Sequence, residues 1–169
     1  MSFTGAITQC LRKYVEFNGR ATRAEFWWWV LAVVIVSFAL NAFNGFINAL
    51  VGQSAFSILP AVFSLAVLLP NLVVTSRRLH DIGKSGWWLL VWIVASVLGT
   101  IPLGIGIAAM VIAVWSGESW WGHPDFWMPL LFGVAVSFLV WIGLFIWWLL
   151  WMVRQGQPGA NRFGPDPRA

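Results

Sequence analysis

Four long apolar segments dominate the pattern of hydrophobic and polar positions along the chain. They cover residues 26–51, 55–75, 87–114 and 128–153, and none contains Asp, Glu, Lys, Arg or His. A helix needs roughly 20 apolar residues to cross a hydrocarbon core of about 30 Å. The pattern therefore predicts four transmembrane helices. The third segment contains Pro102 near its middle, and we expect it to kink there, to tilt, or to end early in an interfacial segment.

The residues before the first apolar segment predict a short amphipathic helix on the membrane surface. Apolar side chains recur there at helical spacing, at Phe3, Ile7, Leu11, Tyr14 and Val15. Residues 22–25, Thr-Arg-Ala-Glu, have the spacing of a capping box. We expect Thr22 to cap the first span and Glu25 to reach back to it.

Composition supports a membrane protein. The 169-residue chain is 60% hydrophobic and 9% charged, whereas soluble domains carry about 25% charged residues. Its 14 Trp and 13 Phe residues exceed what so short a chain can hide in a water-facing core. We predict an all-α membrane protein with a short N-terminal amphipathic interfacial helix in segment 1–25, a four-helix transmembrane domain at 26–153, and an irregular tail at 154–169.

The basic residues predict the orientation. All ten lie outside the apolar segments, at Arg12, Lys13, Arg20, Arg23, Arg77, Arg78, Lys84, Arg154, Arg162 and Arg168. Four spans place all of them on one side of the membrane, so the positive-inside rule predicts that both termini are cytoplasmic. This distribution also explains the basic excess better than nucleic-acid binding, and we predict no nucleic-acid partner.

Polar and small residues within the spans predict helix packing. They form one set per span: Ser37, Asn41, Asn44 and Asn48; Ser57, Ser64 and Asn71; Ser96, Thr100, Gly104 and Ala108; and Gly133 with Ser137. Small and hydroxyl residues let membrane helices approach closely and form hydrogen bonds across the contact. A polar pathway along the three asparagines of the first span is the alternative.

The densest group of polar residues lies in the connection 77–88, Arg-Arg-Leu-His-Asp-Ile-Gly-Lys-Ser-Gly-Trp-Trp. A structural interpretation covers most of it: the two arginines complement the dipole of the second span, Asp81 and Gly83 form a turn, and Ser85 caps the third span. In a functional interpretation, acidic, basic and histidine side chains converge to bind a lipid phosphate or a metal, or to perform acid–base chemistry. The candidate polar cluster comprises Arg20, Arg23, Glu25, Arg77, Arg78, His80, Asp81, Lys84, Asn161 and Arg162.

No catalytic residue, metal site or cofactor is assigned. Glu118, His123 and Asp125 in the loop after the third span are a weak metal-ligand pattern. The tail is rich in Gly and Pro and predicts a strap of turns, on which Phe163 is expected to dock against the inner surface of the helices.

Three motifs together resemble the domain of unknown function 805 family, the YhaH-like bacterial inner-membrane proteins. They are residues 17–29 (Phe-Asn-Gly-Arg-Ala-Thr-Arg-Ala-Glu-Phe-Trp-Trp-Trp), residues 77–88, and residues 161–165 (Asn-Arg-Phe-Gly-Pro). The resemblance implies a small polytopic protein of the bacterial inner (plasma) membrane and implies no activity. The tryptophan-rich loop between the third and fourth spans departs from the family pattern.

Three functions fit these features. The first is a non-enzymatic membrane protein whose basic cytoplasmic face binds anionic phospholipid or a partner protein, since each basic residue near an anionic leaflet contributes about 1 kcal/mol. The second is a small transporter or channel subunit acting as a homo-oligomer, although its spans contain no ionisable residue. The third is an interfacial enzyme acting on lipid headgroups through Glu25, His80 and Asp81.

Overall fold

The chain folds into helices joined by short connections. The computed structural model describes residues 1–51, 58–116 and 124–168. In these ranges the helices are α1 (Phe3–Arg12), α2 (Arg23–Val51), α3 (Ile58–Asp81), α4 (Trp87–Gly99), α5 (Ile101–Trp115) and α6 (Pro124–Val153). Four stretches are long and apolar enough to span a membrane: Arg23–Leu50, Ile58–Asp81, Trp87–Trp115 and Trp127–Val153. The all-α architecture with four apolar helices and a short N-terminal helix is confirmed.

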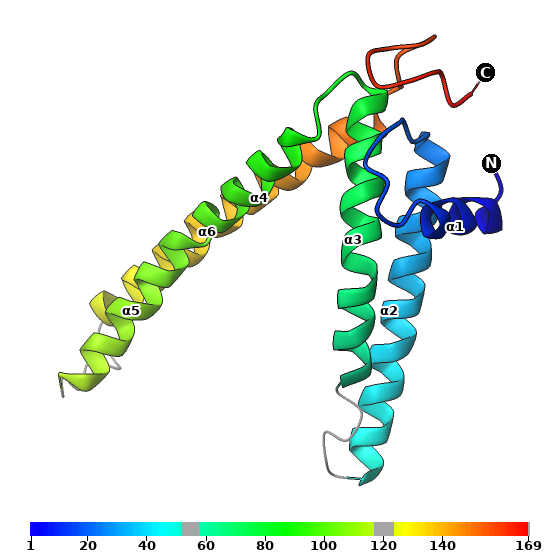
Figure 1. Cartoon of the computed structure of the whole chain (residues 1–169). Coiled ribbons are helices and arrows are strands. Elements are labelled where there is room, and N and C mark those ends of the chain that lie inside the picture. The colour runs from blue at the N-terminus through cyan, green and yellow to red at the C-terminus, as the bar shows by residue number, and fades with distance from the viewer. Residues whose placement is uncertain (52–57, 117–123, 169) are drawn as a thin grey trace. The chain divides into compact units, whose positions relative to one another are not determined.

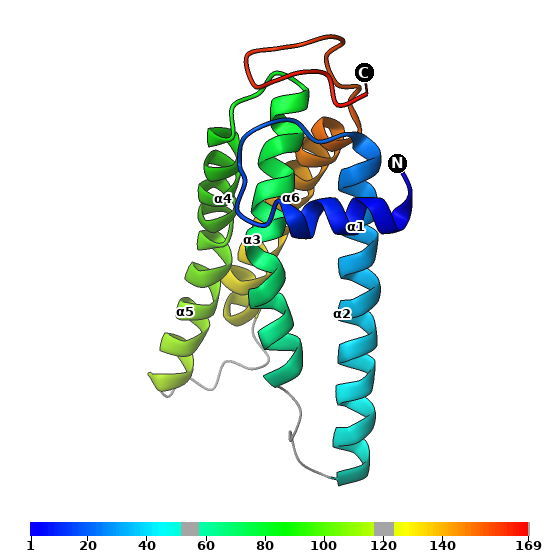
Figure 2. The ribbon, with the colours of Figure 1, turned by 45° about the vertical axis from the view of Figure 1, so that its right-hand side comes forward.

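The helices form two compact units. Unit 1 consists of Met1–Leu89 with Met152–Ala169, and unit 2 of Leu90–Trp151. In unit 1, α2 and α3 run antiparallel side by side and α1 lies across them (Figures 1 and 2). Both termini lie near the same end of the α2–α3 pair (Figure 1).

Side chains from different helices fasten unit 1 together. The Trp29 Nε1–H donates to Asn71 Oδ1 at 2.7 Å, which joins α2 to α3. The Phe3 and Trp28 rings meet edge to face at 5.7 Å, which joins α1 to α2. The Tyr14 hydroxyl donates to the Ala66 carbonyl of α3. Of the polar set predicted on the second span, Asn71 therefore makes the contact between helices, whereas Ser64 bonds to Pro60 O of its own helix.

Helix α1 begins with a side-chain cap and buries its small residues. The Gly5 N–H donates to Ser2 Oγ at 3.2 Å, as at a typical N-cap. Ala6 and Cys10 face the other helices, and burial, followed by the charge of Glu25, raises the pKa of the Cys10 thiol to about 12. Cys10 is therefore a protonated, buried side chain at neutral pH, as expected for a small apolar residue.

Unit 2 is an antiparallel helical hairpin in which α4 and α5 pack against α6 (Figure 2). The third span is interrupted at Thr100, between α4 and α5, two residues before Pro102. Because α5 begins there, the Leu103 N–H donates to Ser137 Oγ of α6, at 3.1 Å, instead of bonding within the helix. A residue of the fourth span thus satisfies a donor that the break exposes.

The predicted small-residue stripe on the third span is partly wrong. Ser96 is buried as expected, but Thr100, Gly104 and Ala108 are exposed. The buried positions after Ser96 are Gly99 and Gly106, which are separated by one heptad. Positions four apart turn away from this contact by about 40° at each step, because a helix has about 3.6 residues per turn. On α6, Gly133 and Ser137 are buried as predicted.

Glycine at the α5–α6 contact allows the two backbones to approach closely. A Cβ on Gly133 would overlap the Pro102 carbonyl, whereas among the described residues nothing lies within 4 Å of a Cβ on Gly104. We therefore expect Gly133→Ala to destabilise the protein by about 1–3 kcal/mol, since an added methyl forces the backbones apart. The matched control Gly104→Ala introduces the same methyl facing open space. Thermal unfolding in detergent micelles measures both variants, and equal melting temperatures would contradict this packing.

Candidate functional site

Three arginines and two acids from distant segments form a buried group in unit 1, here called the arginine cluster: Arg20, Arg77, Arg78, Glu25 and Asp81. Each is at most 4% exposed. Asp81 Oδ1 accepts hydrogen bonds from Arg20 Nε at 3.0 Å and Nη2 at 2.8 Å, and its Oδ2 accepts from Arg78 Nη1 at 2.6 Å. Arg77 Nη1 donates to Glu25 Oε1 at 2.8 Å. Buried charges are tolerated when they are paired and hydrogen-bonded, and each charged group of this cluster has an oppositely charged partner.

The remaining arginine donors hold the backbone of the tail. Arg20 donates to the carbonyls of Gln157 and Gly159. Arg78 donates to Met152 O at 3.2 Å and to Arg154 O. These carbonyls lie at and beyond the last turn of α6, where helix carbonyls lack partners within the helix. The cluster therefore ties the tail to the end of α3.

Asp81 also contacts the tail through its backbone carbonyl and through the packing of its carboxylate against Gly156. The Gln157 N–H donates to the Asp81 carbonyl at 2.8 Å. Gly156 is buried against the Asp81 carboxylate, which occupies the space that a Cβ at this position would need. A larger side chain at 156 would displace the carboxylate from its two arginines.

The start of α2 forms the predicted capping box. The Glu25 N–H donates to Thr22 Oγ1 at 3.1 Å, so Thr22 caps the helix. The Glu25 carboxylate in turn reaches back to the backbone N–H of Thr22. The same carboxylate also accepts a hydrogen bond from Arg77 of α3, a partner that the local spacing does not predict.

The end of α3 forms the predicted turn. The Gly83 N–H donates to the His80 carbonyl at 3.0 Å, so Asp81, the last residue of the helix, and Gly83, whose φ is +77°, lie in the same turn. After this turn the Trp87 N–H bonds to Ser85 Oγ at 3.3 Å, as expected for a cap on the third span.

His80 is held between the N-terminal segment and the tail. Its Nδ1–H donates to Gly19 O at 3.1 Å, and its ring stacks on Phe163 with centroids 4.0 Å apart. Asn161 Nδ2 donates to His80 O at 3.0 Å. The predicted docking of Phe163 is therefore confirmed, and the His80 ring is the surface against which it packs.

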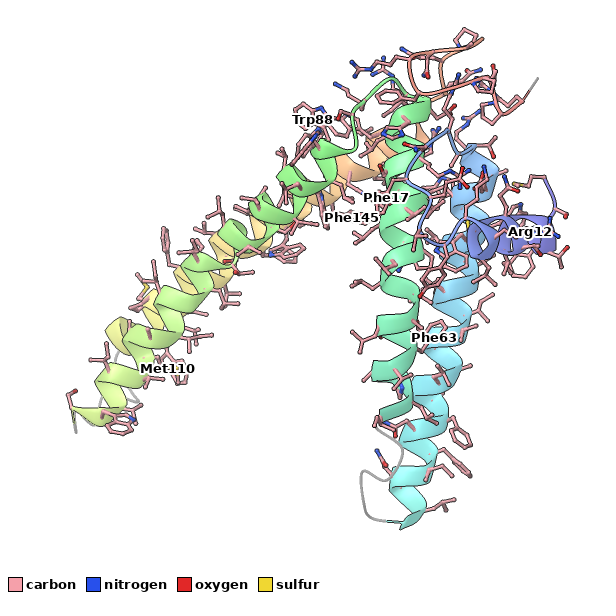
Figure 3. All side chains as sticks on the ribbon, in the orientation of Figure 1. Arg12, Phe17, Phe63, Trp88, Met110 and Phe145 are labelled. Carbon is pink, nitrogen blue, oxygen red and sulfur yellow. The ribbon has the colours of Figure 1, made fainter. Side chains whose placement is uncertain are left out.

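The other predicted residues lie around this core. Lys84 Nζ lies 5.3 Å from the centroid of the Trp88 ring, and the Arg162 guanidinium lies 4.6 Å from that of Phe163. Arg23 is exposed and donates to Val153 O at 3.4 Å. Nitrogen and oxygen atoms of side chains are concentrated at the end of unit 1 where the tail lies (Figure 3).

Two hydrogen-bonded pairs of side chains in the tail were not predicted from the sequence. Gln157 Oε1 accepts from Asn161 Nδ2 at 3.0 Å. Arg168 bonds to Asp166 and lowers the pKa of that carboxyl to about 2. Asp166 and Arg168 lie two residues apart in a Pro-rich turn, a local signal that could have identified this pair.

Unit 1 also contains an open cleft of about 790 Å³ between α1, the start of α2 and the tail. Five cationic residues and two acidic ones line it: Lys13, Arg20, Arg23, Arg77 and Arg168, with Glu25 and Asp81. The arginine cluster therefore forms part of its wall, and Lys13 and Arg23 lie outside that cluster.

The described part of the chain holds no group of three His, Cys, Asp or Glu side chains suited to a metal. Glu118 and His123 lie outside the described residues, as does the side chain of Asp125.

A family model described as "Protein of unknown function (DUF805)" matches residues 14–165. The chain belongs to the DUF805 family. It is 38% identical to the Escherichia coli inner membrane protein YhaI over 158 residues, which cover 94% of this chain and 91% of the relative. It is 29% identical to the Escherichia coli inner membrane protein YhaH over 164 residues, 94% of this chain and 92% of the relative. No solved structure matches.

This DUF805 protein is accordingly a multi-pass protein of the bacterial inner membrane. The family match runs from Tyr14 to Pro165 and so includes the whole arginine cluster and the strap that carries Phe163.

The arginine cluster generates a stability prediction. Asp81→Asn keeps the shape of the side chain but leaves Arg20 and Arg78 without their carboxylate, and we expect a loss of about 3–5 kcal/mol. Glu16→Gln removes a carboxylate that is 53% exposed and pairs with Lys13 only at the surface, so it should change stability little. Unfolding in detergent micelles measures both variants, and a small effect of Asp81→Asn would show that the cluster does not hold the fold.

Proposed function

We propose that the basic end of unit 1 faces the cytoplasm and binds the anionic headgroups of the inner leaflet. One observation carries the proposal: all ten basic residues belong to unit 1, whereas unit 2 contains none. We call these ten residues the charged face. The segments that carry them gather where the termini lie (Figure 1).

The pairing within the charged face supports binding to an anionic surface. Arg20, Arg77 and Arg78 are buried and largely neutralised by Glu25 and Asp81. Arg12, Arg23, Arg154, Arg162 and Arg168 are exposed. Exposed cations close to the membrane attract anionic lipids, by about 1 kcal/mol for each residue near the surface.

Helix α1 and its surroundings suit the boundary of the same leaflet. Large apolar side chains remain exposed there, including Phe3, Leu11, Val15 and Phe17. Basic residues Arg12 and Lys13 lie between them along the chain. Such a segment is stabilised when its apolar side enters the acyl boundary and its cations stay at the headgroups.

The same contacts argue against an enzyme that uses Glu25, His80 and Asp81. The two carboxylates accept hydrogen bonds from buried arginines, and the His80 ring is stacked on Phe163. These contacts favour a scaffold that holds the strap in place. The binding groups of this proposal are the exposed cations around the scaffold.

Lipid selectivity tests the proposal. We expect the detergent-solubilised protein to bind phosphatidylglycerol more tightly than phosphatidylcholine in native mass spectrometry. This preference should weaken as salt rises, because exposed charges are screened. Equal binding of the two lipids at low salt would contradict the proposal.

Orientation is tested separately with fusions to the C-terminus. A fluorescent protein that folds only in the cytoplasm should fluoresce there, and alkaline phosphatase, which requires the periplasm, should be inactive. The same reporters fused after residue 116, between the third and fourth spans, are the matched control and should give the opposite result. Active phosphatase at the C-terminus would contradict a cytoplasmic charged face.

A further inference from the structure

Three cations line the cleft of unit 1 outside the arginine cluster: Lys13, Arg23, and Arg168, which is paired with Asp166. Lys13 Nζ lies 3.8 Å from Glu16 at the surface, and Arg23 makes one long hydrogen bond of 3.4 Å to Val153 O. Both residues line the cleft, Lys13 following α1 and Arg23 at the start of α2. Such weakly held side chains can turn toward an anion at little cost.

Arg77 also lines the cleft and carries a buried donor. Its side chain is 1% exposed, its Nη1 donates to Glu25, and its Nη2 donates to the Arg20 carbonyl. Among the described residues, the buried Arg77 Nε finds no acceptor. A buried N–H without an acceptor is unfavourable, and an anion with several oxygens would provide one.

The carboxylates of the cleft do not cancel its positive charge. Asp81 is bonded to Arg20 and Arg78, and Glu25 is bonded to Arg77. The cluster alone therefore has one more cation than it has anions, and Lys13 and Arg23 add to this excess. The cleft, at about 790 Å³, is also large enough for a small polar group.

We propose that this cleft binds a phosphate monoester, with Lys13 and Arg23 pairing with its oxygens and Arg77 Nε donating a hydrogen bond. A monoester carries up to two negative charges and three terminal oxygens, which suits donors that arrive from three different elements. The inference deepens the proposed function and rests on it, since a headgroup of the inner leaflet is one source of the group. A soluble phosphate ester is the other.

The lipid source is tested by comparing phosphatidic acid, a monoester, with phosphatidylglycerol, a diester. The full chain in detergent is titrated with each lipid in native mass spectrometry. We expect Lys13→Gln and Arg23→Gln each to weaken phosphatidic acid binding by about fivefold, the factor for one cation beside an anionic group. Phosphatidylglycerol binding should change less, so the ratio of the two affinities falls.

Two control variants remove the same charge outside the cleft. Arg12→Gln and Arg154→Gln alter exposed residues of the charged face that do not line it. Each should weaken the binding of both lipids by the same factor and leave the ratio of the two affinities unchanged. A thermal melt confirms that every variant is folded.

The soluble source is tested with glycerol 3-phosphate added to protein labelled with ¹⁵N-arginine. The Arg77 Nε–H resonance, identified by its loss in Arg77→Lys, should shift when a monoester occupies the cleft. The same resonance is followed when phosphatidic acid is added. If both glycerol 3-phosphate and phosphatidic acid shift the Arg77 resonance, the site accepts a monoester from either source. If phosphatidic acid alone shifts it, the site binds lipid.

The inference is overturned if neither ligand moves the Arg77 resonance and the Lys13 and Arg23 variants keep the wild-type ratio. If phosphatidylglycerol is still preferred over phosphatidylcholine in that case, the charged face binds lipid without a phosphate site. If that preference is also missing, the proposed function fails as well.

Discussion

The carboxylate of Asp81 is the contact on which the arrangement of unit 1 depends. It bonds at once to Arg20, which precedes α2, and to Arg78 of its own helix. The same two arginines hold carbonyls of the tail, so one buried acid joins three segments. Removing the Asp81 carboxylate would leave both arginines buried without a counter-charge, which is far more costly than the loss of a surface pair.

This constraint explains why a Gly- and Pro-rich tail is ordered. The tail has little regular structure apart from the bridge between Asn161 and Gly164. Besides its own hydrogen bonds, the tail is held by donors from the buried arginines, by the Asp81 carbonyl and by the His80 ring. Because Phe163 and Arg162 lie on this strap, the cluster also fixes part of the charged face. Structure and proposed binding thus share residues. The buried cations hold the fold, the exposed cations are the proposed lipid contacts, and Arg77 is proposed to serve both.

The sequence predicted those features that depend on composition or on local spacing. Long apolar segments indicated the four helices, Thr22 lies next to the helix it caps, and Phe163 was expected to dock because water is a poor solvent for it. Pairing between distant residues could not be read in this way. Arg20 and Asp81 are separated by 61 positions, and Glu25 and Arg77 by 52. Local spacing correctly predicted the capping box of Glu25, but it gave no sign of the buried guanidinium of Arg77 that the carboxylate also binds. On the third span, a stripe of positions four apart placed Gly104 in the contact that Gly106 makes.

The central claim is that buried arginines order the tail, and hydrogen exchange of the wild-type protein tests it most directly. The amides of Gln157, Asn161, Phe163 and Gly164 are all hydrogen-bonded. Exchange followed by mass spectrometry should therefore find residues 156–165 protected well beyond the rate of an unstructured Gly/Pro segment. Exchange of this segment at the unstructured rate, while α2 and α3 stay protected, would contradict the claim.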